Sequence, residues 1–182
     1  YLADINPLGP VPALKLPDGS VMTESAAMCQ YLAARHGAGQ LDVPVDDAAY
    51  GAYLNWLHMS DATLTFPQTL VLRYTYFEPT ERLQPQVAAD YARWFLARLR
   101  AVDTALQTAD YLCADRFTAA DVAVGYALLL AQHLGLSAQF PPAVAAYWQR
   151  LQARPAYQRA LEKQHHAARD QGVPTTPSPD IR

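Results

Sequence analysis

The sequence has little cysteine, little charge and no long apolar run. Its 182 residues include only two cysteines, Cys29 and Cys113, which cannot form a disulfide framework and lack metal-ligand spacing. A reducing compartment is expected, and we predict a cytoplasmic protein. The net charge of -3 and the lack of a basic run argue against a nucleic-acid partner. No apolar run approaches the length of a membrane span, so no membrane partner is expected.

A metal site is not expected from the histidines or cysteines. His165 and His166 adjoin each other with no third ligand nearby, which favours a solvated helix end over a metal centre. The two cysteines are interpreted as small packing residues rather than nucleophiles. The prediction for metals is therefore none.

The chain nevertheless has the material for a folded core. The length of 182 residues is enough for one large domain or two small ones, and 51% of the residues are hydrophobic, enough for a globular core. Near the N-terminus, two short strands are predicted at 13–16 and 21–23, joined by a turn at Pro17–Ser20. A helix from Glu24 to His36 follows, and Gly37 ends it.

From residue 47 onward the apolar residues recur at helical spacing and no strand pattern is visible. Pro67 is expected to kink the first of these helices. The predicted helices lie at about 47–74, 87–106, 119–134, 142–151 and 155–168. The predicted segments are an α/β domain at 1–36, a linker at 37–46, an all-α domain at 47–170 and a tail at 171–182.

Thr118 and Asp121 form the pattern of a helix capping box. The hydroxyl is expected to bond a backbone N–H one turn into the helix, and the carboxylate to reach back to the Thr118 N–H. The helix that follows is apolar almost all round, which predicts a buried position. We interpret Asp121 as structural, and expect its loss to lower stability by about 1–2 kcal/mol.

Two short motifs near the N-terminus suit ligand binding. The Val11-Pro12 bond stands at a strand entrance, and X–Pro bonds are the ones that adopt cis at modest cost. An ordinary turn before a strand is the alternative. Glu24 and Ser25 stand at a helix start, where open N–H groups suit a carboxylate and an acidic side chain suits an ammonium group. Plain helix capping is the alternative there, and is compatible with binding.

These motifs together resemble the cytosolic glutathione transferase family. The matching residues are Asn6-Pro7, Val11-Pro12-Ala13-Leu14, Asp18-Gly19, Thr23-Glu24-Ser25-Ala26-Ala27 and Phe117-Thr118-Ala119-Ala120-Asp121. The resemblance covers about residues 1 to 168. It implies part of a thioredoxin-like α/β domain followed by the all-helical C-terminal domain of that family.

The resemblance implies a function for the N-terminal motifs. In the family the Val-Pro bond is cis, the valine backbone pairs with the cysteinyl part of glutathione, and the Glu-Ser pair holds the γ-glutamyl head. Carried over, Val11, Pro12, Glu24 and Ser25 bind glutathione as co-substrate. Its thiolate then attacks an apolar electrophile, in a detoxifying transfer reaction.

Further positions are less specific. The resemblance implies that Asp61 reaches glutathione bound to a partner subunit of a homodimer, with a solvated helix face as the alternative. Pro10 stands where many members carry a basic residue that binds the glycyl carboxylate. Six aromatic side chains are expected to divide between an apolar substrate pocket and the core: Tyr50, Tyr53, Trp56, Phe66, Tyr74 and Tyr76.

The resemblance also implies a segment ahead of Tyr1 that carries the catalytic Ser, Cys or Tyr, so the catalytic residue is left unassigned. Two rival functions stay open at this point. One is a glutathione-dependent isomerase of the maleylacetoacetate type, which a Ser-Ser-Cys-like run upstream would favour. The other is a non-catalytic protein that binds glutathione without turnover.

Overall fold

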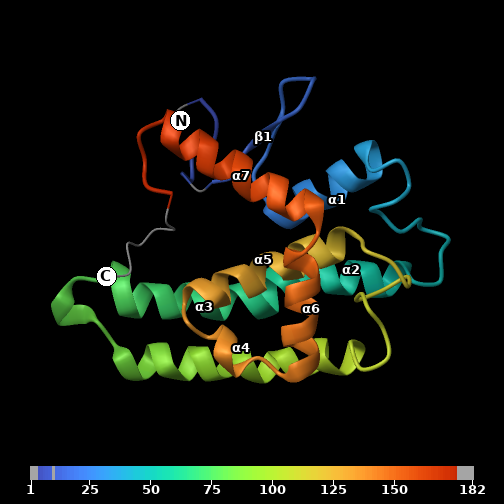
Figure 1. The fold of residues 1–182 in the computed structure, drawn as a ribbon. Coiled ribbons are helices and arrows are strands. Elements are labelled where there is room, and N and C mark those ends of the chain that lie inside the picture. The colour runs from blue at the N-terminus through green and yellow to red at the C-terminus, as the bar shows by residue number, and fades with distance from the viewer. Residues whose placement is uncertain (1–3, 10, 176–182) are drawn as a thin grey trace. The chain divides into compact units, whose positions relative to one another are not determined.

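The computed structural model describes residues 4–9 and 11–175, and its elements are labelled in Figure 1. The chain forms two compact units. The first contains the described residues up to Thr63 together with Ala109–Ala127, and the second contains Leu64–Thr108 and the described residues from Leu128 onward. Each unit is built from segments that are distant in sequence.

The first unit begins with a two-stranded hairpin. Strands β1 (Leu14–Lys15) and β2 (Val21–Met22) are antiparallel, with Leu14 opposite Met22. The Asp18 carboxylate accepts hydrogen bonds from the Ser20 backbone N–H and hydroxyl, at 2.9 and 2.6 Å, which closes the turn. These side-chain bonds hold a hairpin whose strands are only two residues long.

Helix α1 (Ser25–His36) follows the hairpin and packs against α2 (Tyr50–Met59). Ala26, Met28 and Ala33 are its buried residues. The two alanines are small and the methionine is flexible, so α1 can pack closely against α2. The helix starts one residue later than predicted, at Ser25, because Glu24 has extended backbone angles.

The backbone stays helical from Tyr50 to Phe77 but includes two π-helical segments. Between α2 and α3 (Phe66–Leu72) lies a π-helical segment, η1 (Ser60–Thr65), and a second one, η2 (Arg73–Phe77), follows α3. Pro67 is the second residue of α3, and because it has no backbone N–H it cannot make the hydrogen bond that a continuous helix would form there. The π-helical turn thus precedes the proline that was expected to kink the helix.

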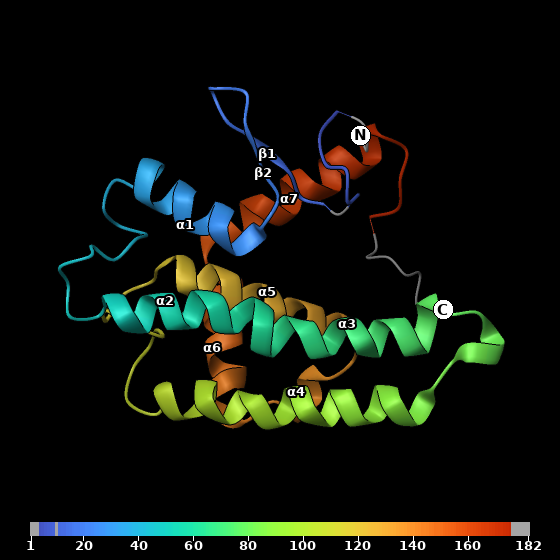
Figure 2. The ribbon, with the colours of Figure 1, turned by 180° about the vertical axis from the view of Figure 1, so that it is seen from behind.

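In the second unit, α3 and α4 (Pro85–Ala105) lie side by side, as both Figure 1 and Figure 2 show. A short 3-10 helix, η3 (Thr80–Arg82), precedes α4. The predicted apolar stripe of α4 is confirmed at its centre, where Phe95, Leu99 and Val102 are fully buried.

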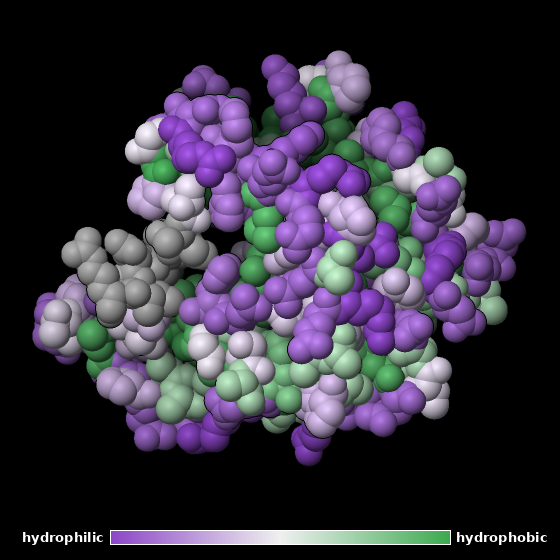
Figure 3. Space-filling model, in the orientation of Figure 1, coloured by the Kyte–Doolittle hydropathy of each residue, from purple (hydrophilic) through white to green (hydrophobic). Residues whose placement is uncertain are grey.

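Helix α5 (Ala119–His133) runs from one unit into the other, and η4 (Ser137–Gln139) follows it. In α6 (Pro142–Gln152), a stripe at helical spacing is buried: Val144, Tyr147, Trp148 and Leu151. The Trp148 indole N–H donates to Gln132 Oε1 at 2.6 Å. Helix α7 (Pro155–Asp170) has no fully buried residue, and its part of Figure 3 is mostly hydrophilic.

The predicted order of a hairpin, a helix and then helices alone is confirmed. No helix among residues 4–9 and 11–175 is both long and apolar enough to cross a bilayer. The domain boundaries drawn from the sequence remain a prediction. Most of the predicted tail, from residue 176 onward, lies outside the described residues.

Candidate functional site

The Val11-Pro12 peptide bond is cis, as predicted. The turn before it is set by Asn6, which is 2% exposed and whose side-chain oxygen accepts the Leu8 N–H at 3.0 Å. The Asn6 carbonyl accepts the Gly9 N–H, also at 3.0 Å. Val11 itself is 77% exposed, and no hydrogen bond ties its backbone to another described residue. Pro10, the expected departure from the family pattern, lies outside the described residues.

Glu24 and Ser25 stand exposed at the beginning of α1. Glu24 is the N-cap, and its carbonyl accepts the Met28 N–H at 2.9 Å. Its side chain makes no capping bond, so the carboxylate is not used by the helix. The first turn contains no acidic residue to compete for its N–H groups. An anion could therefore bind the N–H groups while the Glu24 carboxylate binds a cation.

Asp61 lies near this helix start in the same chain. Burial raises the pKa of its carboxyl, and the negative charge of Glu24 raises it further, whereas His58 and the Ala26 backbone N–H lower it. Asp61 is half-buried in η1. The predicted role of Asp61, toward glutathione of a partner subunit, stays a prediction. Its approach to Ala26 of its own chain had no signal in the sequence.

The two cysteines do not have the character of nucleophiles. Burial raises the pKa of the Cys29 thiol, and Asp61 adds to the increase. Burial is also the main cause that raises the pKa of Cys113. Because the thiolate is the reactive form, both groups are less reactive than an exposed thiol. This agrees with the interpretation of both as packing residues.

The aromatic residues divide between core and surface. Tyr53 and Trp56 are buried, whereas Phe66 and Tyr76 are 55% and 39% exposed. Burial, with Asp42 nearby, raises the pKa of Tyr53 to about 12, so its phenol stays protonated at neutral pH. Tyr53 is therefore a core residue rather than a proton acceptor.

The capping box of α5 is confirmed, with the hydroxyl bond at the second helical residue instead of one full turn in. The Asp121 carboxylate accepts the Thr118 backbone N–H at 2.8 Å, and the Thr118 hydroxyl accepts the Ala120 N–H at 3.3 Å. The second oxygen of Asp121 accepts the Leu112 N–H at 3.1 Å, which the motif did not predict. Asp121 is fully buried. It therefore connects the helix start to the loop before it.

The histidine pair lies near the end of α7, where His166 is on the surface. His166 Nδ1 lies 2.8 Å from an Asp170 carboxylate oxygen, and both side chains are well exposed. Within the described part of the chain, no three His, Cys, Asp or Glu residues are grouped so that they could hold a metal ion.

Comparison with known proteins places this arrangement in one family. The family profile for the glutathione S-transferase N-terminal domain matches residues 1–35, and that for the C-terminal domain matches residues 69–155. Glutathione S-transferase GstA of Escherichia coli O157:H7 is 33% identical over 157 residues, which are 86% of this chain and 75% of that protein.

Solved structures agree. A sphingomonad glutathione S-transferase complexed with glutathione has a TM-score of 0.76 and 26% identity, covering 89% of this chain and 77% of its own. Ure2p5 from Phanerochaete chrysosporium, cocrystallised with 1-(S-glutathionyl)-2,4-dinitrobenzene, has a TM-score of 0.81 over 92% of this chain and 80% of its own. At 22% identity it supports the fold alone. The fold class predicted from the sequence is confirmed, and the chain belongs to the glutathione S-transferase family.

Proposed function

We propose that this protein transfers glutathione to an apolar electrophile. The observation that carries the proposal is the start of α1, where the Glu24 carboxylate is exposed and not used for capping. Glutathione ends in a free amino-acid head with one ammonium and one carboxylate. Glu24 would accept hydrogen bonds from the ammonium, and the Ser25 hydroxyl with the first-turn N–H groups would donate to the carboxylate.

The exposed backbone at Val11 supplies a second contact. An extended peptide can pair with a free backbone edge, and the cysteinyl part of glutathione has one N–H and one C=O for this purpose. The head at α1 and the backbone pairing at Val11 would together fix the direction in which glutathione lies. Binding at two points favours a productive orientation of the thiol.

The reaction itself follows from thiol chemistry. The glutathione thiol loses its proton, its sulfur attacks an electrophilic carbon, a C–S bond forms, and the leaving group departs with its bonding electrons. The thiol must have a lowered pKa for this step. Neither Cys29 nor Tyr53 is suited to activate it, because the pKa of each is raised. We assign the activating role to none of the described residues.

We also propose a cytoplasmic homodimer, with α1 and residues 47–107 as the contact surface. Asp61 would then be available to the glutathione of the partner subunit, as the family resemblance implies. A two-fold arrangement is the commonest one for such oligomers.

The test of the proposed site is Glu24→Ala in the full-length protein. A hydrogen bond to a charged group contributes about 1.5–3 kcal/mol. Glutathione affinity should therefore fall by roughly 10- to 100-fold, measured by calorimetry. Glu162→Ala, at an exposed position on α7, is the matched control and should bind like the wild type. Unchanged affinity in Glu24→Ala would refute the assignment.

A further inference from the structure

Two consecutive backbone carbonyls of the segment between α1 and α2 accept hydrogen bonds from the first residue of α5 and from the loop just before it. The Ala119 N–H donates to the Leu41 carbonyl at 2.7 Å. The Arg116 guanidinium donates through Nη2 to the Asp42 carbonyl, also at 2.7 Å. These residues are more than seventy positions apart in sequence, and Ala119 is only 3% exposed. The pair of bonds therefore ties this segment to the start of α5.

The same segment is in close contact with the end of α1. The Gly37 N–H caps the helix by donating to the Ala33 carbonyl at 2.9 Å. A Cβ atom at Gly37 would overlap the Ala33 carbonyl oxygen and lie 3.1 Å from the Leu41 Cβ. Leu41 thus lies directly against the last turn of α1. A displacement of Leu41 must move the end of α1 or open a gap beside it.

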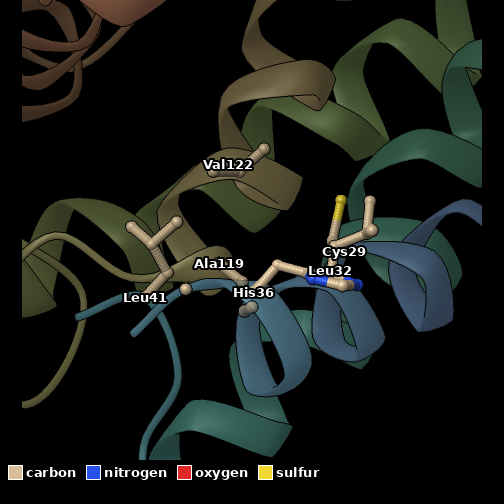
Figure 4. A pocket seen from close by; sticks show the side chains of 8 residues that line it. Cys29, Leu32, His36, Leu41, Ala119 and Val122 are labelled. Carbon is tan, nitrogen blue, oxygen red and sulfur yellow. The ribbon is translucent and has the colours of Figure 1, made fainter. Parts of the chain in front are cut away.

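Side-chain packing between α1 and α5 is incomplete at this place. An apolar groove of about 320 Å³, open to solvent, lies between Cys29 and Leu32 of α1 and Ala119 and Val122 of α5, with Leu41 at its border (Figure 4). Leu32 and Val122 are 42% and 44% exposed, so they do not close the space between the two helices. The hydrogen bonds to the segment consequently hold the end of α1 where apolar contacts do so only in part.

We infer that Arg116 is a positioning residue for glutathione binding. It does not touch the ligand in the proposed site. By holding the Asp42 carbonyl it fixes Leu41, and through Leu41 the direction of α1. Because α1 is a single helix, a shift at its last turn displaces its first turn, where Glu24 stands. This inference rests on the proposed function, since it concerns the affinity of the same site.

The first experiment compares Arg116→Met with Arg116→Lys in the full-length protein. Methionine keeps much of the length of the side chain but cannot donate, so the Kd and KM for glutathione should rise about three- to tenfold. The kcat at saturating glutathione should stay within about twofold, because the reacting groups are unchanged. Lysine restores a donor and should recover most of the affinity.

Arg100→Met is the matched control. Arg100 also donates to a backbone carbonyl, that of Ala97 at 3.1 Å, but this bond lies within the exposed face of α4. Its loss should leave glutathione binding unchanged. A merely structural role of Arg116 would lower the melting temperature without changing KM in the folded protein.

Gly37→Ala gives a second, independent test, because it disturbs the same contact from the α1 side and leaves Arg116 in place. It should also raise the KM for glutathione, and it decides the question if Arg116→Met does not fold. If the wild type binds glutathione and Glu24→Ala weakens it, but Arg116→Met and Gly37→Ala bind like the wild type, the inference is overturned and the proposed function stands. If the wild type does not bind glutathione, the proposed function itself fails.

Discussion

Replacing Asp121 by alanine should destabilise the protein more than the loss of an ordinary helix cap. The carboxylate is fully buried and accepts two backbone N–H groups, from Thr118 and from Leu112. Both donors belong to buried residues, with Thr118 at 0% and Leu112 at 6% exposure. The substitution leaves both without this partner, in a place that water does not reach.

The magnitude follows from the number of orphaned donors. A buried polar group left unsatisfied costs about 1–3 kcal/mol, and a lost cap alone costs about 0.5–2 kcal/mol. With two donors affected, we expect a loss of about 2–4 kcal/mol, which exceeds the value expected from the motif alone. For a chain of this size the melting temperature should fall by about 5–15 °C.

Thermal melting paired with turnover per folded molecule is the appropriate assay. Turnover should stay near that of the wild type, because the Asp121 carboxylate bonds the backbone of Thr118 and Leu112, and neither residue belongs to the proposed glutathione site. Asp90→Ala is the control, since Asp90 is half exposed and pairs with Arg93 at the surface. A variant that melts like the wild type but has lost turnover would make Asp121 a site residue and refute this reasoning.

Three further predictions concern reactivity, pH and assembly. Iodoacetamide should alkylate Cys29 and Cys113 more slowly in the native protein than in urea, because burial raises the pKa of both thiols; faster native alkylation would count against this. Burial lowers the pKa of His133 below its usual 6.5, so the unfolded chain binds this proton more readily. The stability due to neutral His133 is therefore complete above that pH and is lost as the pH falls, and urea melts between about pH 7 and pH 5 should show a smaller loss in His133→Gln. Sedimentation of the full-length protein should show a dimer at micromolar concentration, and a monomer alone would contradict the proposed assembly.

The parts of the fold that the sequence predicted well are those with strong local signals. The apolar stripe around Phe95 and Leu99 keeps helical spacing over about five turns, so an amphipathic helix explains it better than a strand or a loop. The turn at Asp18 and the cap at Thr118 use side chains that bond their own backbone. Each of these hydrogen bonds joins residues only two positions apart, so the sequence alone is enough to predict it.

The parts that could not be predicted depend on contacts distant in sequence. The π-helical segments on either side of α3 have no sequence pattern that distinguishes them from an α-helix. The bond from Arg116 to the Asp42 carbonyl joins residues far apart, and a backbone acceptor leaves no mark on the sequence. The approach of Asp61 to the start of α1 also joins residues distant in sequence, and it involves the Ala26 backbone, so the sequence did not indicate it.

The most direct test of the central claim is conjugation of glutathione to 1-chloro-2,4-dinitrobenzene by the full-length protein. The account predicts 1-(S-glutathionyl)-2,4-dinitrobenzene and chloride, formed faster than without protein and at a rate that saturates with glutathione. Glu24→Ala should raise the KM for glutathione in the same assay. A protein that binds glutathione, yet accelerates neither this reaction nor conjugation to any of a panel of apolar electrophiles, would contradict the claim that it is a transferase.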